Sequence, residues 1–368
     1  MSSKKDKFTF KDKKYMKLAL DLARARKGLT GNNPSVGCLI VKNDKIVSIG
    51  QTGHNGRPHA EHSAIKNSFE KLKGSKMYVT LEPCNHYGKT PPCTNDIIKS
   101  GISELIYSME DIDKRVRGKS FKILSGKKIT VKKGLLKEDA KLLYDSYIKN
   151  RTNKLPYITA KIAVSKNKLI YSKGSKRITD NSSDKITHYL RYKNDSIMVT
   201  SKTVNIDNPK LNCRLNGYDK FSPKRIILDK NLNINLKSYI IKSVKKDNTI
   251  LFYNVPNIVK IKALKKKGVI LIKIKLDHEK LLDLKIVLKK LFALGARNLL
   301  VEGGDKLTKN LIRNKLIDTF YLFKSSKILK KNKINQTFTS FKILKNIYKR
   351  KSRISSKIAK DNISIYRI

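Results

Sequence analysis

Three side chains in the first hundred residues have the types and the spacing of a catalytic metal site. They are His59, Cys84 and Cys93. A catalytic zinc ion takes three protein ligands, commonly imidazole and thiolate, and leaves its fourth tetrahedral position to water. The sequence therefore predicts one zinc ion per chain, bound by this histidine and these two cysteines.

Glu61 follows His59 by two residues, in the run Pro58-His59-Ala60-Glu61. A carboxylate there can take a proton from the metal's water, because zinc lowers the pKa of that water toward about 7. His-x-Glu followed by Pro-Cys and a further Cys is a recognised signature of zinc deaminases. Glu61 is thus the predicted catalytic residue. The alternative is that the cysteines are small buried hydrophobic residues and the histidine a helix cap.

Length and composition favour two domains in a reducing compartment. A chain of 368 residues with 39% hydrophobic residues is long for one core. Four cysteines are too few for a disulfide scaffold. The charged amino terminus lacks an apolar secretory segment, and no apolar run is long enough to span a membrane. We expect a cytoplasmic protein with no membrane partner.

The formal net charge of +54 would by itself suggest a polyanionic partner. The lysines are, however, spread through every segment together with many Ile and Asn residues. This distribution favours drift toward AT-rich codons over a surface built for nucleic acid. We expect no specific nucleic-acid partner, although non-specific binding to RNA at low salt would follow.

Hydrophobic periodicity in the first half predicts helices that alternate with short strands. The expected helices cover residues 15–26, 59–72, 94–100 and 137–149, and the expected strands 36–41, 46–50, 77–80 and 104–107. This alternation predicts a layered α/β domain, with the zinc ligands at strand ends and helix starts.

Three runs carry a family resemblance: Asn33-Pro34-Ser35-Val36-Gly37-Cys38, Pro58-His59-Ala60-Glu61 and Leu81-Glu82-Pro83-Cys84-Asn85-His86-Tyr87-Gly88-Lys89-Thr90-Pro91-Pro92-Cys93. Together they resemble the bifunctional deaminase and reductase of riboflavin biosynthesis. Eight residues separate Cys84 from Cys93, whereas deaminases of nucleic-acid bases usually keep about two between their cysteines. The resemblance implies a cytidine-deaminase-like three-layer domain that acts on a diaminopyrimidine ribosyl phosphate.

The resemblance also implies substrate contacts at Asn33, His86 and Lys89, to the pyrimidine and its phosphoribosyl group. Without the surrounding motif, the three would be an ordinary turn asparagine, loop histidine and solvated lysine. One position departs from the family. Thr52 stands where a histidine is often found seven residues before the zinc histidine, and His54 is the candidate replacement.

The second half restarts after a polar stretch at 150–154 that has no periodicity, and we place the domain boundary there. The family resemblance implies that these domains are a zinc-dependent deaminase over 1–150 and an NADPH-dependent reductase over 155–368. The reductase half should contain strands over 156–163, 196–200, 225–228, 249–253, 269–274 and 298–302, and helices over 180–192 and 283–294. Gly303-Gly304-Asp305 should open a further helix, where bare backbone can bind phosphate. Paired glycines alone are more often a turn.

The runs 174–179, 190–191, 199–214 and 301–304 resemble the reductase half of the same family in order and spacing. The resemblance, which covers roughly residues 12 to 325, implies a dihydrofolate-reductase-like fold that binds NADPH. The implied cofactor contacts are Ala163, Arg177, Thr203, Asp207 and Gly304. The implied substrate contacts are Ser175, Arg191, Leu211, Arg214 and Glu302. Guanidinium forks suit a phosphate, and a carboxylate suits ribose hydroxyls.

Two departures affect the expected cofactor affinity. Ser165-Lys166-Asn167-Lys168 replaces the family's Ser-Leu-Asp-Gly, and Arg177 replaces an aromatic residue.

The sequence leaves three functions open. The first is hydrolytic deamination followed by NADPH reduction of the ribosyl to the ribityl chain, by a homo-oligomer. The second is a deaminase whose degenerate reductase half binds without reducing, and the third is a nucleic-acid base deaminase. The last forty residues are expected to add closing strands to the second sheet.

Overall fold

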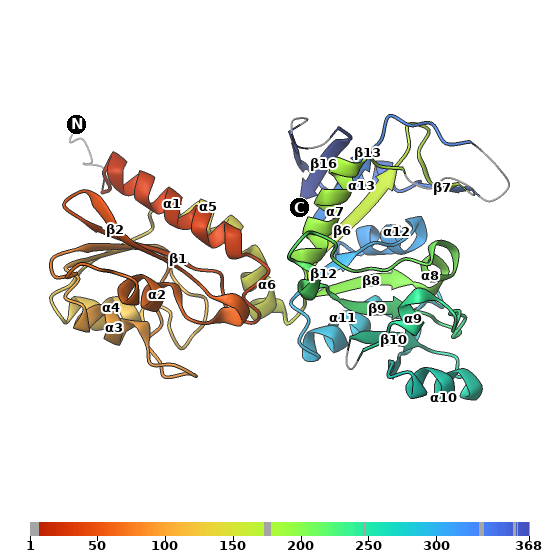
Figure 1. Cartoon of the computed structure of the whole chain (residues 1–368), viewed down its shortest axis with the longest axis horizontal. Coiled ribbons are helices and arrows are strands. Elements are labelled where there is room, and N and C mark those ends of the chain that lie inside the picture. The colour runs from red at the N-terminus through yellow and green to blue at the C-terminus, as the bar shows by residue number, and fades with distance from the viewer. Residues whose placement is uncertain are drawn as a thin grey trace. The chain divides into compact units, whose positions relative to one another are not determined.

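The computed structural model describes residues 7–172, 178–245, 248–330, 335–355, 358 and 360–367. The chain divides into two compact units, Met1–Asn153 and Lys154–Ile368 (Figure 1). Each unit has its own hydrophobic core. Among the described residues, no helix combines the length and the apolar character needed to cross a membrane.

The first unit is built on a five-stranded mixed sheet with the strand order β2-β1-β3-β4-β5. Strand β1 pairs antiparallel with β2 and β3, whereas β3, β4 and β5 are parallel. The strands are β1 (Gly37–Lys42), β2 (Lys45–Gln51), β3 (Lys76–Leu81), β4 (Glu104–Met109) and β5 (Thr130–Lys133). The helices are α1 (Phe10–Arg26), α2 (Ala60–Lys66), α3 (Cys93–Lys99), α4 (Lys119–Ser125), α5 (Lys137–Leu143) and α6 (Asp145–Asn153).

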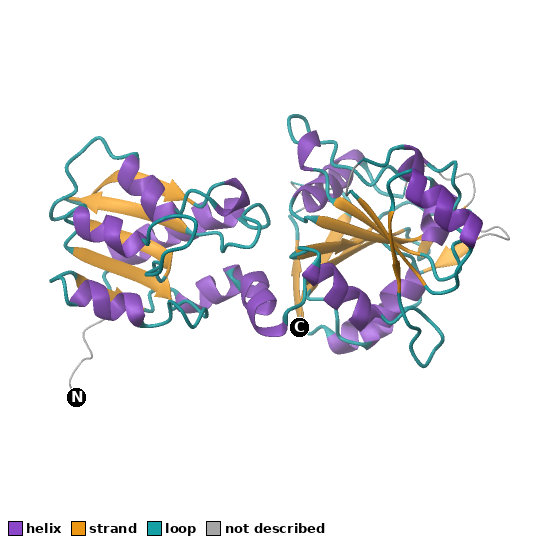
Figure 2. Ribbon diagram, turned by 90° about the horizontal axis from the view of Figure 1, so that it is seen from below, coloured by secondary structure: helices purple, strands orange, loops and turns teal. Residues whose placement is uncertain are grey.

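Two glycines in the β1–β2 hairpin let helices approach both faces of this sheet. A Cβ atom on Gly37 would lie 2.0 Å from the Ala19 carbonyl oxygen of α1. A Cβ atom on Gly50 would lie 2.0 Å from the Ala60 carbonyl oxygen of α2. Cys38 is paired with Gly50 in the ladder, so Gly37, its neighbour, faces the other side. The sheet is therefore the middle of three layers, as predicted, and Figure 2 shows helices on both of its sides.

Three predictions for this unit need correction. The helix predicted over 59–72 ends at Lys66, because Ser68 bonds through its side chain to the backbone of Glu70 and so stabilises a turn in place of a helix. The helix predicted over 137–149 is two helices, α5 and α6. The polar stretch at 150–154, which has no periodicity in the sequence, is helical up to Asn153.

The second unit is built on a nine-stranded sheet with the order β11-β10-β9-β8-β12-β6-β13-β16-β15. The strands from β11 to β13 are parallel, and β16 and β15 close the sheet in antiparallel fashion, as expected for the carboxy-terminal residues. The strands are β6 (Tyr157–Val164), β8 (Ser196–Thr200), β9 (Lys224–Leu228), β10 (Thr249–Tyr253), β11 (Ile270–Lys273), β12 (Asn298–Val301), β13 (Thr319–Lys324), β15 (Arg350–Arg353) and β16 (Asn362–Arg367). A separate pair consists of β7 (Leu169–Ser172) and β14 (Asn335–Thr337).

Alternate residues of the parallel strands enter two cores, one on each face of the sheet. Ile226 and Phe252 belong to one core, whereas their neighbours Ile227 and Leu251 belong to the other. The covering helices are α7 (Asn181–Tyr192), α8 (Ser201–Asp207), α9 (Tyr239–Lys242), α10 (Ile258–Lys266), α11 (Leu284–Ala293), α12 (Asp305–Arg313) and α13 (Phe341–Ile347). This is the predicted α/β fold for the second half.

Candidate active sites

The three predicted zinc ligands are brought together by two helix starts and one loop. His59 is the residue that precedes α2, and Cys93 is the first residue of α3. Cys84 lies in the loop after β3, and its sulfur accepts a hydrogen bond of 3.3 Å from the Cys93 backbone N–H. The loop and the helix start are thereby held against each other, next to the carboxyl end of β3.

The geometry of these three side chains fits a zinc ion. Their ligand atoms all lie within 4.8 Å of one another. His59 Nδ1 is 3.3 Å from Cys93 Sγ and 3.5 Å from Cys84 Sγ. Tetrahedral zinc with ordinary Zn–N and Zn–S bonds places such atoms about 3.5 Å apart. One imidazole and two thiols at this spacing are a ligand set that zinc prefers.

The surroundings already favour a thiolate at this site. Hydrogen bonding from Cys93, followed by that from His59, lowers the pKa of Cys84 to about 4. The same hydrogen bond and burial raise the pKa of Cys93, because the two thiols share one proton. Burial, followed by the charge of Cys84, raises the pKa of Glu61 to about 7. A carboxyl with that pKa can both accept and release a proton near neutral pH.

A cavity of about 300 Å³ is lined by two of the three zinc ligands, His59 and Cys84. Its lining includes Glu61 and all three residues predicted to contact the substrate, namely Asn33, His86 and Lys89. Thr52, at the position where the family often has histidine, also lines it and donates through Oγ1 to the Pro34 carbonyl oxygen. His54 does not line this cavity, so the structure does not support His54 as the residue that replaces the family's histidine.

Two of the predicted substrate residues, Asn33 and His86, have polar side-chain atoms available to bond to a ligand. Asn33 Nδ2 donates to the Gly56 carbonyl oxygen at 2.9 Å, which leaves its side-chain oxygen for a ligand. A Cβ atom on Gly56 would lie 2.5 Å from Asn33 Nδ2, and its φ of +91° also requires glycine. In the described part of the chain, His86 Nδ1 is buried and has no hydrogen-bond partner. Such an atom is expected to bond to a ligand.

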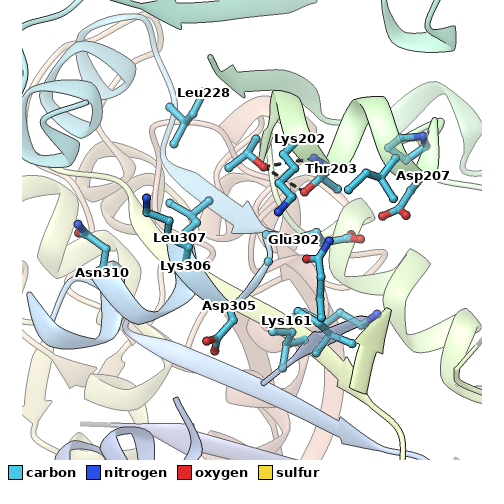
Figure 3. Close-up of a pocket in the computed structure, with 18 of the residues that line it drawn as sticks. Lys161, Lys202, Thr203, Asp207, Leu228, Glu302, Asp305, Lys306, Leu307 and Asn310 are labelled. Carbon is cyan, nitrogen blue, oxygen red and sulfur yellow. Dashed lines mark hydrogen bonds between the residues drawn. The ribbon is translucent and has the colours of Figure 1, made fainter. Parts of the chain in front are cut away.

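The second unit contains a larger cavity, of about 660 Å³, at the carboxyl ends of its parallel strands. Thr200 ends β8, Leu228 ends β9 and Glu302 follows β12, and all three line it. Figure 3 shows Lys202, Thr203 and Asp207 of α8 on one side and Asp305, Lys306 and Asn310 of α12 on the other. Ligands of open parallel sheets bind at this end of the strands.

The lining of this cavity fits a dinucleotide. Its volume lies within the usual range for cofactor sites, and its walls combine leucines with lysines. Gly304 precedes α12 and offers no side-chain cap, so the backbone N–H groups of the first turn can meet an anion. A Cβ atom on Gly303 would lie 2.7 Å from a methyl carbon of Leu307, so a larger residue there would require the leucine to move.

Most, but not all, of the predicted reductase residues line this cavity. Ala163, Thr203, Asp207, Gly304, Arg191, Leu211 and Glu302 line the cavity. Arg214 does not, and its backbone N–H donates to His188 Nδ1 at 3.2 Å. Ser175 and Arg177 lie outside the described residues.

Arg191 and Glu302 bind each other. Nε and Nη2 of the arginine donate to the two carboxylate oxygens at 2.7 and 2.8 Å, and Nη1 donates to the Asn212 carbonyl oxygen at 3.1 Å. The sequence treated the two as separate substrate contacts. The guanidinium group and the carboxylate each use hydrogen-bonding atoms on the other. The structure therefore indicates that Arg191 and Glu302 form one buried ion pair at the cavity wall.

Lys161 is a cavity residue that the sequence reasoning missed. It lies on β6 with its ammonium 4.9 Å from the centre of the Phe323 ring. Burial lowers its pKa, although the charge of Glu302 opposes the shift. The signal was present, because Lys161 is the one charged residue in the strand predicted over 156–163.

The segment Ser165-Lys166-Asn167-Lys168, which departs from the family's Ser-Leu-Asp-Gly, still forms a turn. Asn167 Nδ2 donates to the Leu329 carbonyl oxygen at 2.8 Å, and its Oδ1 accepts from the Leu329 N–H at 3.2 Å. Lys168 takes the family's glycine position with a φ of +64°, which is uncommon for a lysine. The turn is therefore retained, held by the asparagine.

Both halves match known families. Residues 9–109 match the cytidine and deoxycytidylate deaminase zinc-binding region, and residues 156–357 match the RibD C-terminal domain. The riboflavin biosynthesis protein RibD of Aquifex aeolicus is 38% identical over 320 residues, covering 86% of this chain and 88% of that protein. The RibD protein of Escherichia coli is 30% identical over 338 residues, covering 86% and 88%.

Solved structures agree with these matches. Acinetobacter baumannii RibD gives a TM-score of 0.81 at 26% identity, covering 97% of this chain and 98% of that one. The diaminohydroxyphosphoribosylaminopyrimidine deaminase/5-amino-6-(5-phosphoribosylamino)uracil reductase of Thermotoga maritima gives 0.79 at 28% identity, with the same coverage. The chain thus belongs to the RibD family of bifunctional riboflavin biosynthesis enzymes, which combine a zinc-dependent deaminase with an NADPH-dependent reductase.

Proposed function

We propose that the first unit, Met1–Asn153, carries out the deamination, with zinc held by His59, Cys84 and Cys93 and the proton moved by Glu61. The observation that carries this assignment is the spacing of the three ligand atoms, together with the buried Glu61 carboxyl, which lines the same cavity as His59 and Cys84. Zinc would supply a Lewis acid that lowers the pKa of water. The Glu61 carboxylate takes a proton from the attacking water and delivers it to the departing amino group, so that water and the amidine give a carbonyl and ammonia.

The polar lining of the cavity is assigned to the substrate. Asn33 Oδ1 and His86 Nδ1 bond to the pyrimidine, because both residues line the cavity, Asn33 is fixed through its Nδ2, and the buried His86 Nδ1 has no partner among the described residues. Lys89 contacts the phosphoribosyl group. The nucleic-acid base deaminase is disfavoured by the separation of Cys84 from Cys93 and by the second catalytic unit.

Replacing Cys84 or Cys93 by serine should remove the zinc. Two protein ligands are too few to retain a metal that needs three, and the hydroxyl of serine is a poor donor for zinc. Metal analysis of the purified variants should give about one zinc per wild-type chain and far less in each variant. Cys213→Ser, in the second unit, is the matched control and should keep its zinc. Full zinc content in both Cys84→Ser and Cys93→Ser would refute the ligand set.

Residues 155–368 are assigned to the reductase step. NADPH, when bound, would supply the two electrons that convert the ribosyl to the ribityl chain. Ala163, Thr203, Asp207 and Gly304 are its proposed contacts, together with Arg177. The Arg191–Glu302 pair, Lys161 and Leu211 face the substrate, together with Ser175. Arg214 lies outside the cavity lining, and its side chain donates to Asn212 Oδ1 at 2.8 Å, so we assign it to positioning that loop. The protein is proposed to act in the cytoplasm as a homo-oligomer.

Separate assays decide between the bifunctional enzyme and a deaminase with a binding-only second half. Ammonia release from the diaminopyrimidine ribosyl phosphate reports the first step, and NADPH oxidation with the deaminated product reports the second. Activity in both supports the proposal. Ammonia release with NADPH binding but no oxidation would favour the degenerate reductase.

A chain from Leu155 to Ile368 should fold by itself. The nine-stranded sheet and both of its cores are formed from residues after Asn153. Such a fragment should show cooperative unfolding and oxidise NADPH when given the deaminated intermediate. A chain begun at Ser165, which deletes the central strand β6, is the control and should not fold. An aggregated or unfolded Leu155–Ile368 fragment would contradict this boundary.

A further inference from the structure

A carboxylate at the edge of the deaminase cavity holds two arginines. Arg115 donates through Nε and Nη2 to the two side-chain oxygens of Asp113, at 3.0 and 2.6 Å. Arg151 Nη1 lies 3.9 Å from the same carboxylate. Asp113 is only 13% exposed, whereas the side chains of Arg115 and Arg151 are 59% and 36% exposed. The carboxylate is thus on the inside and the guanidinium groups face solvent.

Two further cations line the same cavity. Arg57 Nη1 donates to Thr90 Oγ1 at 2.5 Å, which fixes the arginine against the loop that also carries Lys89. With Arg115 and Arg151, four cationic side chains surround the cavity that reaches the zinc ligands. They come from four separate parts of the fold: the approach to α2, the loop between the two cysteines, the segment after β4, and α6.

The other carboxylates of the lining are buried and already bonded. Glu82 is 3% exposed and accepts from the backbone N–H groups of Asp111, Gly118 and Ser120. Asp111 is 7% exposed and accepts from the Tyr147 hydroxyl at 3.0 Å and from the Asp113 backbone N–H at 2.9 Å. Glu61 lies at the zinc site. The charge that an incoming ligand meets at the open side is therefore positive.

We propose that Arg115 and Arg151, oriented by Asp113, form the subsite that binds the 5′-phosphate of the deaminase substrate, with Arg57 completing it. This rests on the deaminase function proposed above. Arg115 uses two of its five N–H donors on Asp113, so a fork of N–H groups remains for phosphate oxygens. A carboxylate that holds two arginines in place lowers the entropy lost when a phosphate binds. Neither arginine belongs to the motif that marks the zinc site.

The subsite is tested by the steady-state kinetics of ammonia release in the full-length zinc-loaded protein. The variants are Arg115→Ala, Arg151→Ala and the double variant. Each is assayed with the diaminopyrimidine ribosyl phosphate and with the same compound lacking the phosphate. We expect each single variant to raise KM for the phosphorylated substrate about 10- to 100-fold, the loss of one charge-assisted contact. The kcat value and the KM for the unphosphorylated compound should stay within about threefold.

Arg117→Ala is the matched control. Arg117 lies on the same loop and is exposed, but it does not line the cavity, so its removal should leave both KM values unchanged. Asp113→Asn keeps both arginines but removes the charge that orients them, and should give an intermediate rise in KM for the phosphorylated substrate alone. Zinc content and the unfolding midpoint of each variant identify any that do not fold.

Binding of inorganic phosphate provides a readout that needs no turnover. Titration calorimetry should detect phosphate binding to the wild type and to Arg117→Ala, and a loss of at least tenfold in affinity in the double variant. A double variant with wild-type KM and phosphate affinity overturns the proposal, as does an equal rise in KM for both substrates. A wild type that binds phosphate through these arginines yet releases no ammonia would retain the subsite and reject the deaminase function.

Discussion

Replacing Glu61 by glutamine should lower the rate of ammonia release by about a hundred- to ten-thousand-fold and leave the zinc content unchanged. Glutamine has nearly the size and shape of glutamate but cannot carry a proton between water and the amino group. Glu61 is 4% exposed in the first turn of α2, so a change of equal volume should fit the same space. The zinc ligands themselves are not altered.

Glu70→Gln is the matched control for this prediction. Glu70 lies nine residues further along the chain, is exposed, and does not line the cavity, so the same chemical change there should leave kcat and KM unchanged. NADPH oxidation with the deaminated intermediate should remain at the wild-type rate in Glu61→Gln, because that step belongs to the second unit. A Glu61→Gln enzyme that deaminates at the wild-type rate would remove Glu61 from its proposed role.

The zinc site was predictable because its chemistry fixes residue types within short runs of sequence. The histidine and the catalytic carboxylate are two residues apart, and Cys84 and Cys93 lie at the two ends of one loop. Metal ligation restricts the residue at each position far more than hydrophobic burial does. The layered fold was predictable for a related reason, since strand and helix periodicities alternate along the chain.

The remainder of the deaminase cavity was not predictable from local patterns. Tyr147 and Arg151 reach it from α6, more than fifty residues after Cys93, in a stretch whose sequence indicated only a closing helix and a linker. Likewise, the Arg191–Glu302 pair joins residues 111 positions apart. In a chain with 83 lysines and arginines, no local feature distinguishes a buried arginine from the many exposed ones. Only the packed structure identifies which charges are desolvated.

Breaking the Arg191–Glu302 pair should destabilise the second unit strongly. The two side chains are 10% and 14% exposed, and they share two short hydrogen bonds. Removal of one partner leaves the other as an uncompensated buried charge, which typically costs about 3–5 kcal/mol. Arg191→Met and Glu302→Gln should each lower the free energy of unfolding of the Leu155–Ile368 fragment by about this amount, measured by urea denaturation. Arg313→Met, on the exposed side of α12, is the control and should change it by no more than about 0.5 kcal/mol.

The double variant Arg191→Met/Glu302→Gln separates pairing from independent substrate contacts. If the two groups stabilise the fold through each other, the double variant should cost much less than the sum of the single variants, because no unpaired charge remains. Burial raises the pKa of Glu302, but Arg191 outweighs it and leaves that pKa below its usual value. A lowered folded-state pKa means that this stabilisation is present above the unfolded pKa of glutamate, about 4.3, and is lost as the pH falls through the folded value. The wild-type fragment should therefore lose stability in acid more steeply than the double variant. Additive single effects, together with identical acid profiles, would show that the two residues act separately and return them to the independent substrate roles that the sequence suggested.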